Sequence, residues 1–160
     1  MRRGLVLFAL SALLLPPAAI AVTRGTGDGT LSVRDGRGTF VINARGGIIG
    51  SFAKGRVIIT DPVDGDGSGP IVSGDEWHRD RGETTDVWGG TRVRFRLIGG
   101  AFKIKVIGRG VNLSVVGRGT VTLSGEGTLD DGSYSVNDGD YQQVPPVPLT
   151  FSLNSTAAVF

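Results

Sequence analysis

The sequence contains no cysteine, and only one histidine and one methionine occur among its 160 residues. Without cysteine the chain can form no disulfide bond, thiol nucleophile or cysteine-ligated zinc site. A domain of this length buries roughly two-thirds of its unfolded surface. A packed core must therefore supply the stability that disulfides give many exported proteins.

Long apolar runs are also scarce, and the single example lies at the start. Arg2 and Arg3 precede the run GLVLFALSALLLPPAAIA, which ends in the small-residue signal Ala19-Ile20-Ala21. This order is typical of a cleaved signal peptide. It predicts a signal peptide over 1–21 and one all-β domain over 22–160, secreted or in the cell envelope.

An uncleaved membrane anchor is the alternative for this run. Pro16 and Pro17 interrupt the run, which is already at the short limit for a membrane-spanning helix. We therefore favour cleavage, and we expect no transmembrane segment after it.

An excess of one charge is missing as well. Of the 17 basic residues two are Arg2 and Arg3, so 15 remain to balance the 15 acidic residues. This balance gives no support to nucleic-acid binding. The cations concentrate in 22–60 and 91–124 and the acids in 61–90 and 125–160, as expected if acidic loops neutralise basic strands.

Glycine is abundant, with 27 residues, and no apolar stripe of helical period follows the signal segment. Runs such as TFVINA, RVRFRL, FKIKVI and TVTLS alternate apolar and polar residues and are rich in β-branched side chains. Such runs predict an all-β domain of short strands, about four to seven residues each, separated by glycine turns.

An internal repeat is the main clue to architecture. Residues 30–77 align with 94–141 without a gap, so that Phe40 meets Ile104 and Ile42 meets Val106. We interpret this as two similar meander units that bury each other's apolar faces, in a pseudo-symmetric β-sandwich or small β-barrel. Chance similarity is the alternative for the repeat. A β-solenoid is the alternative for the fold, although we find no uniform short period.

The segment DGDGSGPIVSGD is the best candidate for a metal site. Asp64, Asp66, Ser68 and Asp75 occupy positions 1, 3, 5 and 12 of an EF-hand or dockerin-like calcium loop. The loop departs from that pattern in having Pro70 at position 7 and an aspartate in place of the final glutamate. A solvated turn without metal is the alternative.

A basic sheet face is the second candidate site. Arg94, Arg96, Lys103 and Lys105 alternate with apolar residues, so a strand would place these cations on one side. They are suited to an anionic polysaccharide or an envelope protein, through carboxylate or phosphate groups. Without interleaved aromatic residues, nucleic acid is a poorer partner for this face.

Catalysis has little support in the residue inventory. His78 is the only histidine, with Asp75, Glu76, Asp80 and Glu83 nearby, and no hydrolase motif accompanies it. A charged loop is the simpler interpretation, and a hydrolase is the least favoured function. We expect a non-enzymatic structural or binding module, with calcium-stabilised adhesion or binding to anionic polymers as alternatives.

The segments RFRLIGG, GRGTVTL and DDGSYSVN, with TDP and GDG upstream, resemble a group of small secreted all-β bacterial proteins that have no assigned activity. This resemblance spans most of the chain after the signal segment. It implies secretion and a single domain, and it carries over no catalytic or ligand residue.

Overall fold

A computed structural model describes residues 25–63 and 65–157, and the predicted signal peptide lies outside these ranges. The described residues form no helix, and therefore no helix among them could cross a membrane. The all-β prediction is confirmed. The strands are β1 (Gly29–Thr60), β2 (Gly67–Ser73), β3 (Trp77–Asp80), β4 (Thr85–Gly125), β5 (Ser133–Val136), β6 (Gln142–Gln143) and β7 (Leu149–Leu153).

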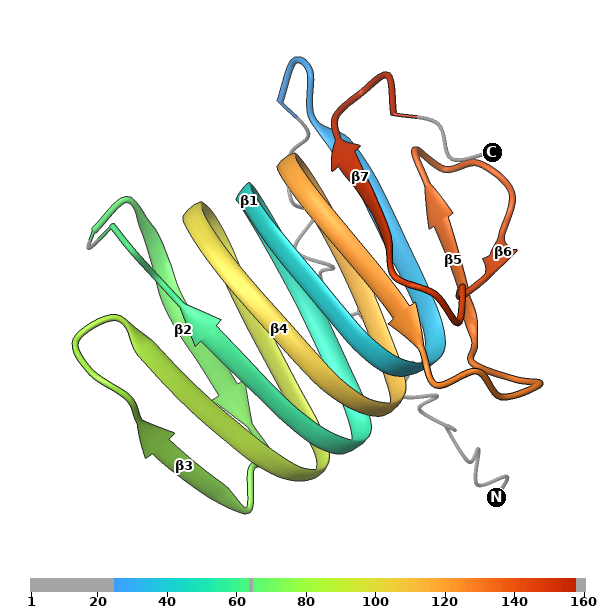
Figure 1. Cartoon of the computed structure of the whole chain (residues 1–160). Helices are drawn as coiled ribbons and strands as arrows, with labels where there is room; N and C mark the ends of the chain where they lie inside the picture. Colours follow the sequence, from blue (N-terminus) through green and yellow to red (C-terminus); the bar gives the residue numbers. More distant parts are fainter. Residues whose placement is uncertain (1–24, 64, 158–160) are drawn as a thin grey trace, which may run out of the picture.

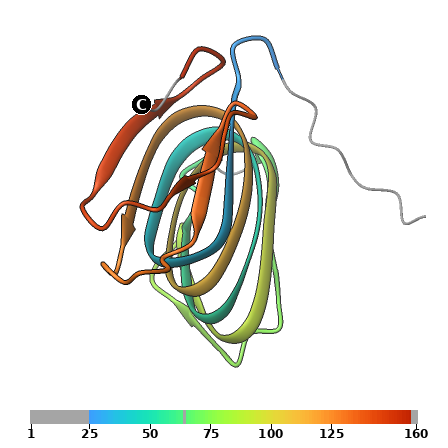
Figure 2. The ribbon, with the colours of Figure 1, turned by 90° about the vertical axis from the view of Figure 1, so that its right-hand side faces the viewer.

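Two strands, β1 with 32 residues and β4 with 41, make up most of the domain (Figure 1). Both wind in successive turns, like a flattened spring seen end-on in Figure 2. The prediction of short strands between glycine turns is therefore wrong. Most of the glycines that were expected to end strands lie inside β1 and β4.

The two long strands interleave, because β1 lies between successive turns of β4. Ile42, for example, pairs with Ile104 on one side and with Val121 on the other, antiparallel in both cases. The segments proposed as two copies therefore do not fold into separate halves. Stacked turns are a feature shared with the solenoid alternative, but here neighbouring strands are antiparallel.

Each turn of the coil crosses the molecule twice, and the crossings stack into two layers. In the first layer, called sheet 1, the pairing order is β2, 91–98 of β4, 47–54 of β1, 109–116 of β4, the start of β1, β5 and β6. In the second layer, called sheet 2, the pairing order is β3, 85–89 of β4, 56–60 of β1, 101–107 of β4, 39–45 of β1, 118–124 of β4 and β7. The fold is thus sandwich-like, as predicted, and the sheet does not close into a barrel.

Glycine forms the bends between the layers. Gly38, Gly46 and Gly55 follow one another at intervals of eight and nine residues, and each has a positive φ. A Cβ added to Gly46 would lie 2.1 Å from the carbonyl oxygen of Val116 on the adjacent turn. Only glycine allows this approach. One bend stacks five glycines in register across successive turns: Gly125, Gly38, Gly108, Gly55 and Gly90.

The core lies between the two layers. Strand alternation points Phe40 and Ile42 inward from sheet 2, and Phe95 and Leu97 inward from sheet 1, each no more than 2% exposed. Outward positions carry polar or charged side chains for the most part. Burial of each large apolar side chain contributes roughly 1.5–3 kcal/mol, which is how the chain is stable without disulfides.

The glycine bends give a direct test of the coil. Gly46→Ala should lower the free energy of unfolding by about 3 kcal/mol, because the methyl group collides with the backbone of the adjacent turn. Gly69→Ala is the matched control, since a Cβ there meets no atom within 4 Å. Urea unfolding followed by circular dichroism measures both, and equal stability of the two variants would contradict the bend geometry.

Candidate functional site

The four cations predicted to share one face lie on opposite layers. Arg94 and Arg96 point outward from sheet 1, whereas Lys103 and Lys105 point outward from sheet 2. The alternation of cations outward and apolar residues inward is confirmed. The prediction that all four cations share one face is wrong, because the chain bends between the arginine pair and the lysine pair. This bend lies at Gly99 and Gly100, where φ is 77° and 79°.

The outer surface of sheet 1 carries an open groove of about 660 Å³ around the arginine pair. One row of side chains crosses five neighbouring strand segments in direct register: Ile71, Arg96, Ile49, Ser114 and Ser32. A second row runs beside it through Ser73, Arg94, Ser51 and Asn112. The groove could not be predicted from the sequence, because these segments are distant in sequence and only the coil brings them together.

Polar contacts hold the far end of the groove in place. Asn112 accepts a hydrogen bond from the backbone N–H of Asp35 at 3.1 Å and donates one to the Gly110 carbonyl at 3.2 Å. The hydroxyls of Ser32 and Tyr141 lie 2.7 Å apart, and the Arg34 guanidinium lies 4.0 Å above the Tyr141 ring. These contacts restrict the positions of the side chains at this end of the groove.

The groove is positively charged. Its lining within 25–63 and 65–157 includes three arginines, Arg34, Arg94 and Arg96, and no carboxylate or histidine. Among the described residues none of the three arginines has an ion-pair partner. Ile49 and Ile71, next to Arg96 in its row, are 44% and 51% exposed, so the groove also has apolar surface open to solvent.

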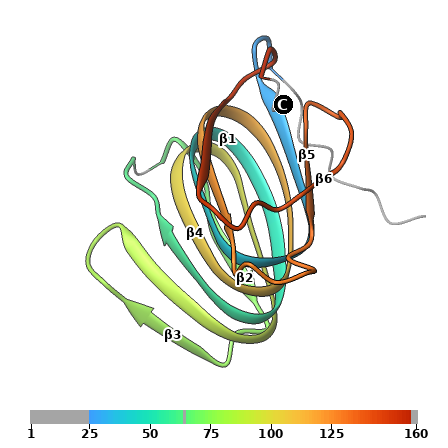
Figure 3. The same cartoon turned by 45° about the vertical axis from the view of Figure 1, so that its right-hand side comes forward.

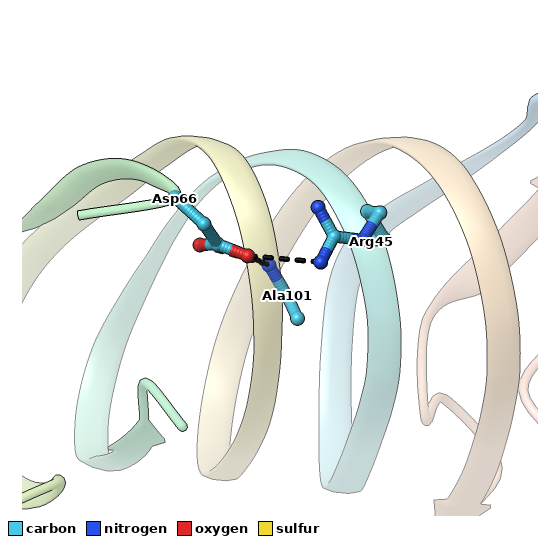
Figure 4. A network of polar contacts seen from close by, with 3 residues as sticks. All are labelled: Arg45, Asp66 and Ala101. Carbon is cyan, nitrogen blue, oxygen red and sulfur yellow. Dashed lines mark hydrogen bonds and ion pairs between the residues drawn. The ribbon is translucent and has the colours of Figure 1, made fainter. Parts of the chain in front are cut away.

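Asp66, a predicted calcium ligand, instead joins neighbouring turns (Figure 4). Its carboxylate lies 3.0 Å from Nη2 of Arg45 and accepts a hydrogen bond from the backbone N–H of Ala101. Ala101 follows the bend between the layers. An acidic loop residue thus neutralises a basic strand residue here, as the charge segmentation predicted.

Ser68 and Asp75, two other predicted calcium ligands, do not form a cluster with Asp66. Ser68 lies in β2, paired with Ile98, and Asp75 comes after β2 ends, so the extended strand separates Asp66 from Asp75 by roughly 20 Å. Asp64 lies outside the described residues. Within 25–63 and 65–157 no group of three or more His, Cys, Asp or Glu side chains is placed to hold a metal ion.

His78 lies in β3 at one end of the coil (Figure 3). Its Nε2 is 2.7 Å from Oδ1 of Asp86, and its ring stacks on Trp88 with centroids 4.9 Å apart. Asp86 was not among the carboxylates singled out from the sequence, because it reaches His78 only across the β3–β4 pairing. Both side chains are well exposed, at 46% and 35%.

Comparison with protein-family models, with curated proteins and with solved structures finds no match. The resemblance to secreted bacterial proteins therefore stays a prediction. The geometry of the described residues alone carries the functional argument.

Calcium removal tests the placement of Asp66. Excess chelator should leave the thermal melt unchanged, because Asp66 is held by Arg45 and Ala101 and not by a cation. Asp66→Ala should lower the free energy of unfolding by about 1–2 kcal/mol, with or without calcium. Asp75→Ala, at an exposed position, is the control and should have little effect. A melt that rises with calcium only while Asp66 is present would contradict this placement.

Proposed function

We propose that the protein is a secreted, non-enzymatic binding module of the cell envelope or extracellular space, and that its sheet 1 groove binds an anionic polymer such as an acidic polysaccharide. Secretion in this proposal rests on the signal peptide predicted over 1–21. The binding role rests on the charge and shape of the groove.

The observation that carries the proposal is the set of groove arginines that have no carboxylate partner among the described residues. Arg34, Arg94 and Arg96 line one open surface that contains no acidic residue. A guanidinium presents a planar fork of donors that matches a carboxylate or phosphate group. Three such forks, fixed by strands of one sheet, favour a ligand that carries several anionic groups.

The dimensions favour a polymer over a small ion. The longer row crosses five neighbouring strand segments, and four spacings of about 4.8 Å give a length of about 19 Å. Hydroxyl and amide groups between the arginines can hydrogen-bond sugar hydroxyls. The exposed isoleucines can contact the less polar faces of sugar rings.

The absence of acid–base groups in the lining favours binding over catalysis. A hydrolase needs a carboxylate, histidine or similar group within reach of its substrate. The described residues that line the groove include neither a carboxylate nor a histidine, and His78 belongs to β3, at the edge of sheet 2.

Affinity chromatography tests the proposal. The protein purified after export should be retained on immobilised polygalacturonate, in a salt-sensitive manner, and not on neutral dextran. The double variant Arg94→Gln/Arg96→Gln should bind about tenfold more weakly, because it loses two charge-assisted contacts. The matched control is Lys103→Gln/Lys105→Gln, which removes the same charge from the opposite layer and should bind within about twofold of the unaltered protein.

The two double variants also define the results that would contradict the proposal. Equal loss in both would show that net charge alone drives retention, with no role for the groove. Retention that depends on neither pair, or capture only of an acidic envelope protein, would also overturn the polysaccharide proposal.

A further inference from the structure

A second, smaller cationic pocket lies where the β3 hairpin meets sheet 2. Its volume is about 140 Å³, and it is lined by Arg56, Ile58, Trp77, Arg79, Arg81 and Val87. Three of these six side chains are cations and none is an acid. The bends at Gly55 and Gly90 place this pocket on the layer opposite the groove.

Strand alternation explains why cations and acids separate here. β3 runs antiparallel to β4, with Trp77 paired to Gly89 and Arg79 paired to Val87. Trp77 and Arg79 therefore face the pocket, while His78 and Asp80 face the other way. Arg81, just beyond β3, also lines the pocket, and Arg56 reaches it from β1.

Three carboxylates close to the pocket in sequence have other partners. Glu76 accepts hydrogen bonds from the backbone N–H and hydroxyl of Thr91, Asp80 accepts one from the Gly82 N–H at 2.8 Å, and Asp86 contacts His78. None of the three pocket arginines has an ion pair with another described residue. Within the described part of the chain, their guanidinium groups are therefore available to an anion from outside.

Trp77 holds one side of the pocket in place. Its indole packs over Gly89, where an added Cβ would lie 2.1 Å from the ring. The Arg79 guanidinium lies 5.5 Å from the centre of the same ring, a cation–π contact that restricts the arginine's motion. The indole, which is 40% exposed, thus forms a wall that positions one cation.

We propose that this pocket binds a single oxyanion group, a phosphate, sulfate or carboxylate, through Arg56, Arg79 and Arg81. The pocket is well below the roughly 300–1,000 Å³ of sites that enclose whole small molecules, so it fits one charged group and not an entire sugar or nucleotide. The group comes either as a free ion or as a substituent of a polymer. This site does not depend on the sheet 1 groove.

Trp77 also provides the measurement. The chain has two tryptophans, so Trp88→Phe leaves Trp77 as the only tryptophan fluorophore. Titration with sulfate or inorganic phosphate, at constant ionic strength set with chloride, should give a saturable change in its emission. A parallel titration with dextran sulfate against neutral dextran distinguishes a free ion from a polymer substituent.

Charge removal identifies the residues. The double variant Arg56→Gln/Arg81→Gln, made in the Trp88→Phe chain, should weaken the affinity measured from Trp77 emission at least tenfold. It keeps Arg79 beside the Trp77 ring, so the environment of the fluorophore is preserved. Arg109→Gln, an exposed cation that lines neither this pocket nor the groove, is the control and should have no effect. Arg94→Gln/Arg96→Gln should leave the response intact even if the groove fails to bind polymer.

The proposal is overturned if no probe gives saturation at concentrations that would fill a millimolar site, or if Arg109→Gln weakens the response equally. Should Trp88→Phe not fold, side-chain Nε–H resonances of the arginines in the unaltered protein give the same test. Shifts of Arg56, Arg79 and Arg81 with sulfate or dextran sulfate support the site, and uniform shifts of all arginines contradict it.

Discussion

Close contact of backbones at the glycine bends is the constraint on which the rest of the structure depends. A chain that turns every eight or nine residues can stack its turns tightly only where no Cβ intervenes, and at Gly38, Gly46 and Gly55 the adjacent turn occupies that space. These bends place alternate half-turns in two layers. The layers enclose the apolar side chains, and their outer faces carry the polar ones.

Much of the fold could be predicted from the sequence, because strand alternation is a local property. The runs TFVINA and RVRFRL identify correctly which side chains are buried, and the all-β, sandwich-like class follows from them. Strand length could not be predicted, because glycine between apolar runs usually indicates a turn that ends a strand. The spacing of Gly38, Gly46 and Gly55 was the available signal for a coil. The repeat of 30–77 in 94–141 stays a prediction, although most of its apolar pairs are buried at both positions.

The candidate sites show where local patterns fail. Period 2 correctly places Arg94 and Lys103 outward, but a bend between them reverses the direction of the chain and moves them to opposite layers. Likewise, the calcium-like spacing after Asp66 becomes an extended strand. Both surfaces proposed to bind anions join segments distant in sequence, and strand pairing brings their arginines together.

The interleaving of β1 between turns of β4 is the central claim, because it produces the bends, the core and both cationic surfaces. Cross-strand nuclear Overhauser effects in the isotope-labelled protein test it most directly. The account predicts backbone contacts from Asn43 to both Lys103 and Thr120, one on each side. Contacts to only one of them, or to residues of a short local hairpin, would contradict the coil and everything derived from it.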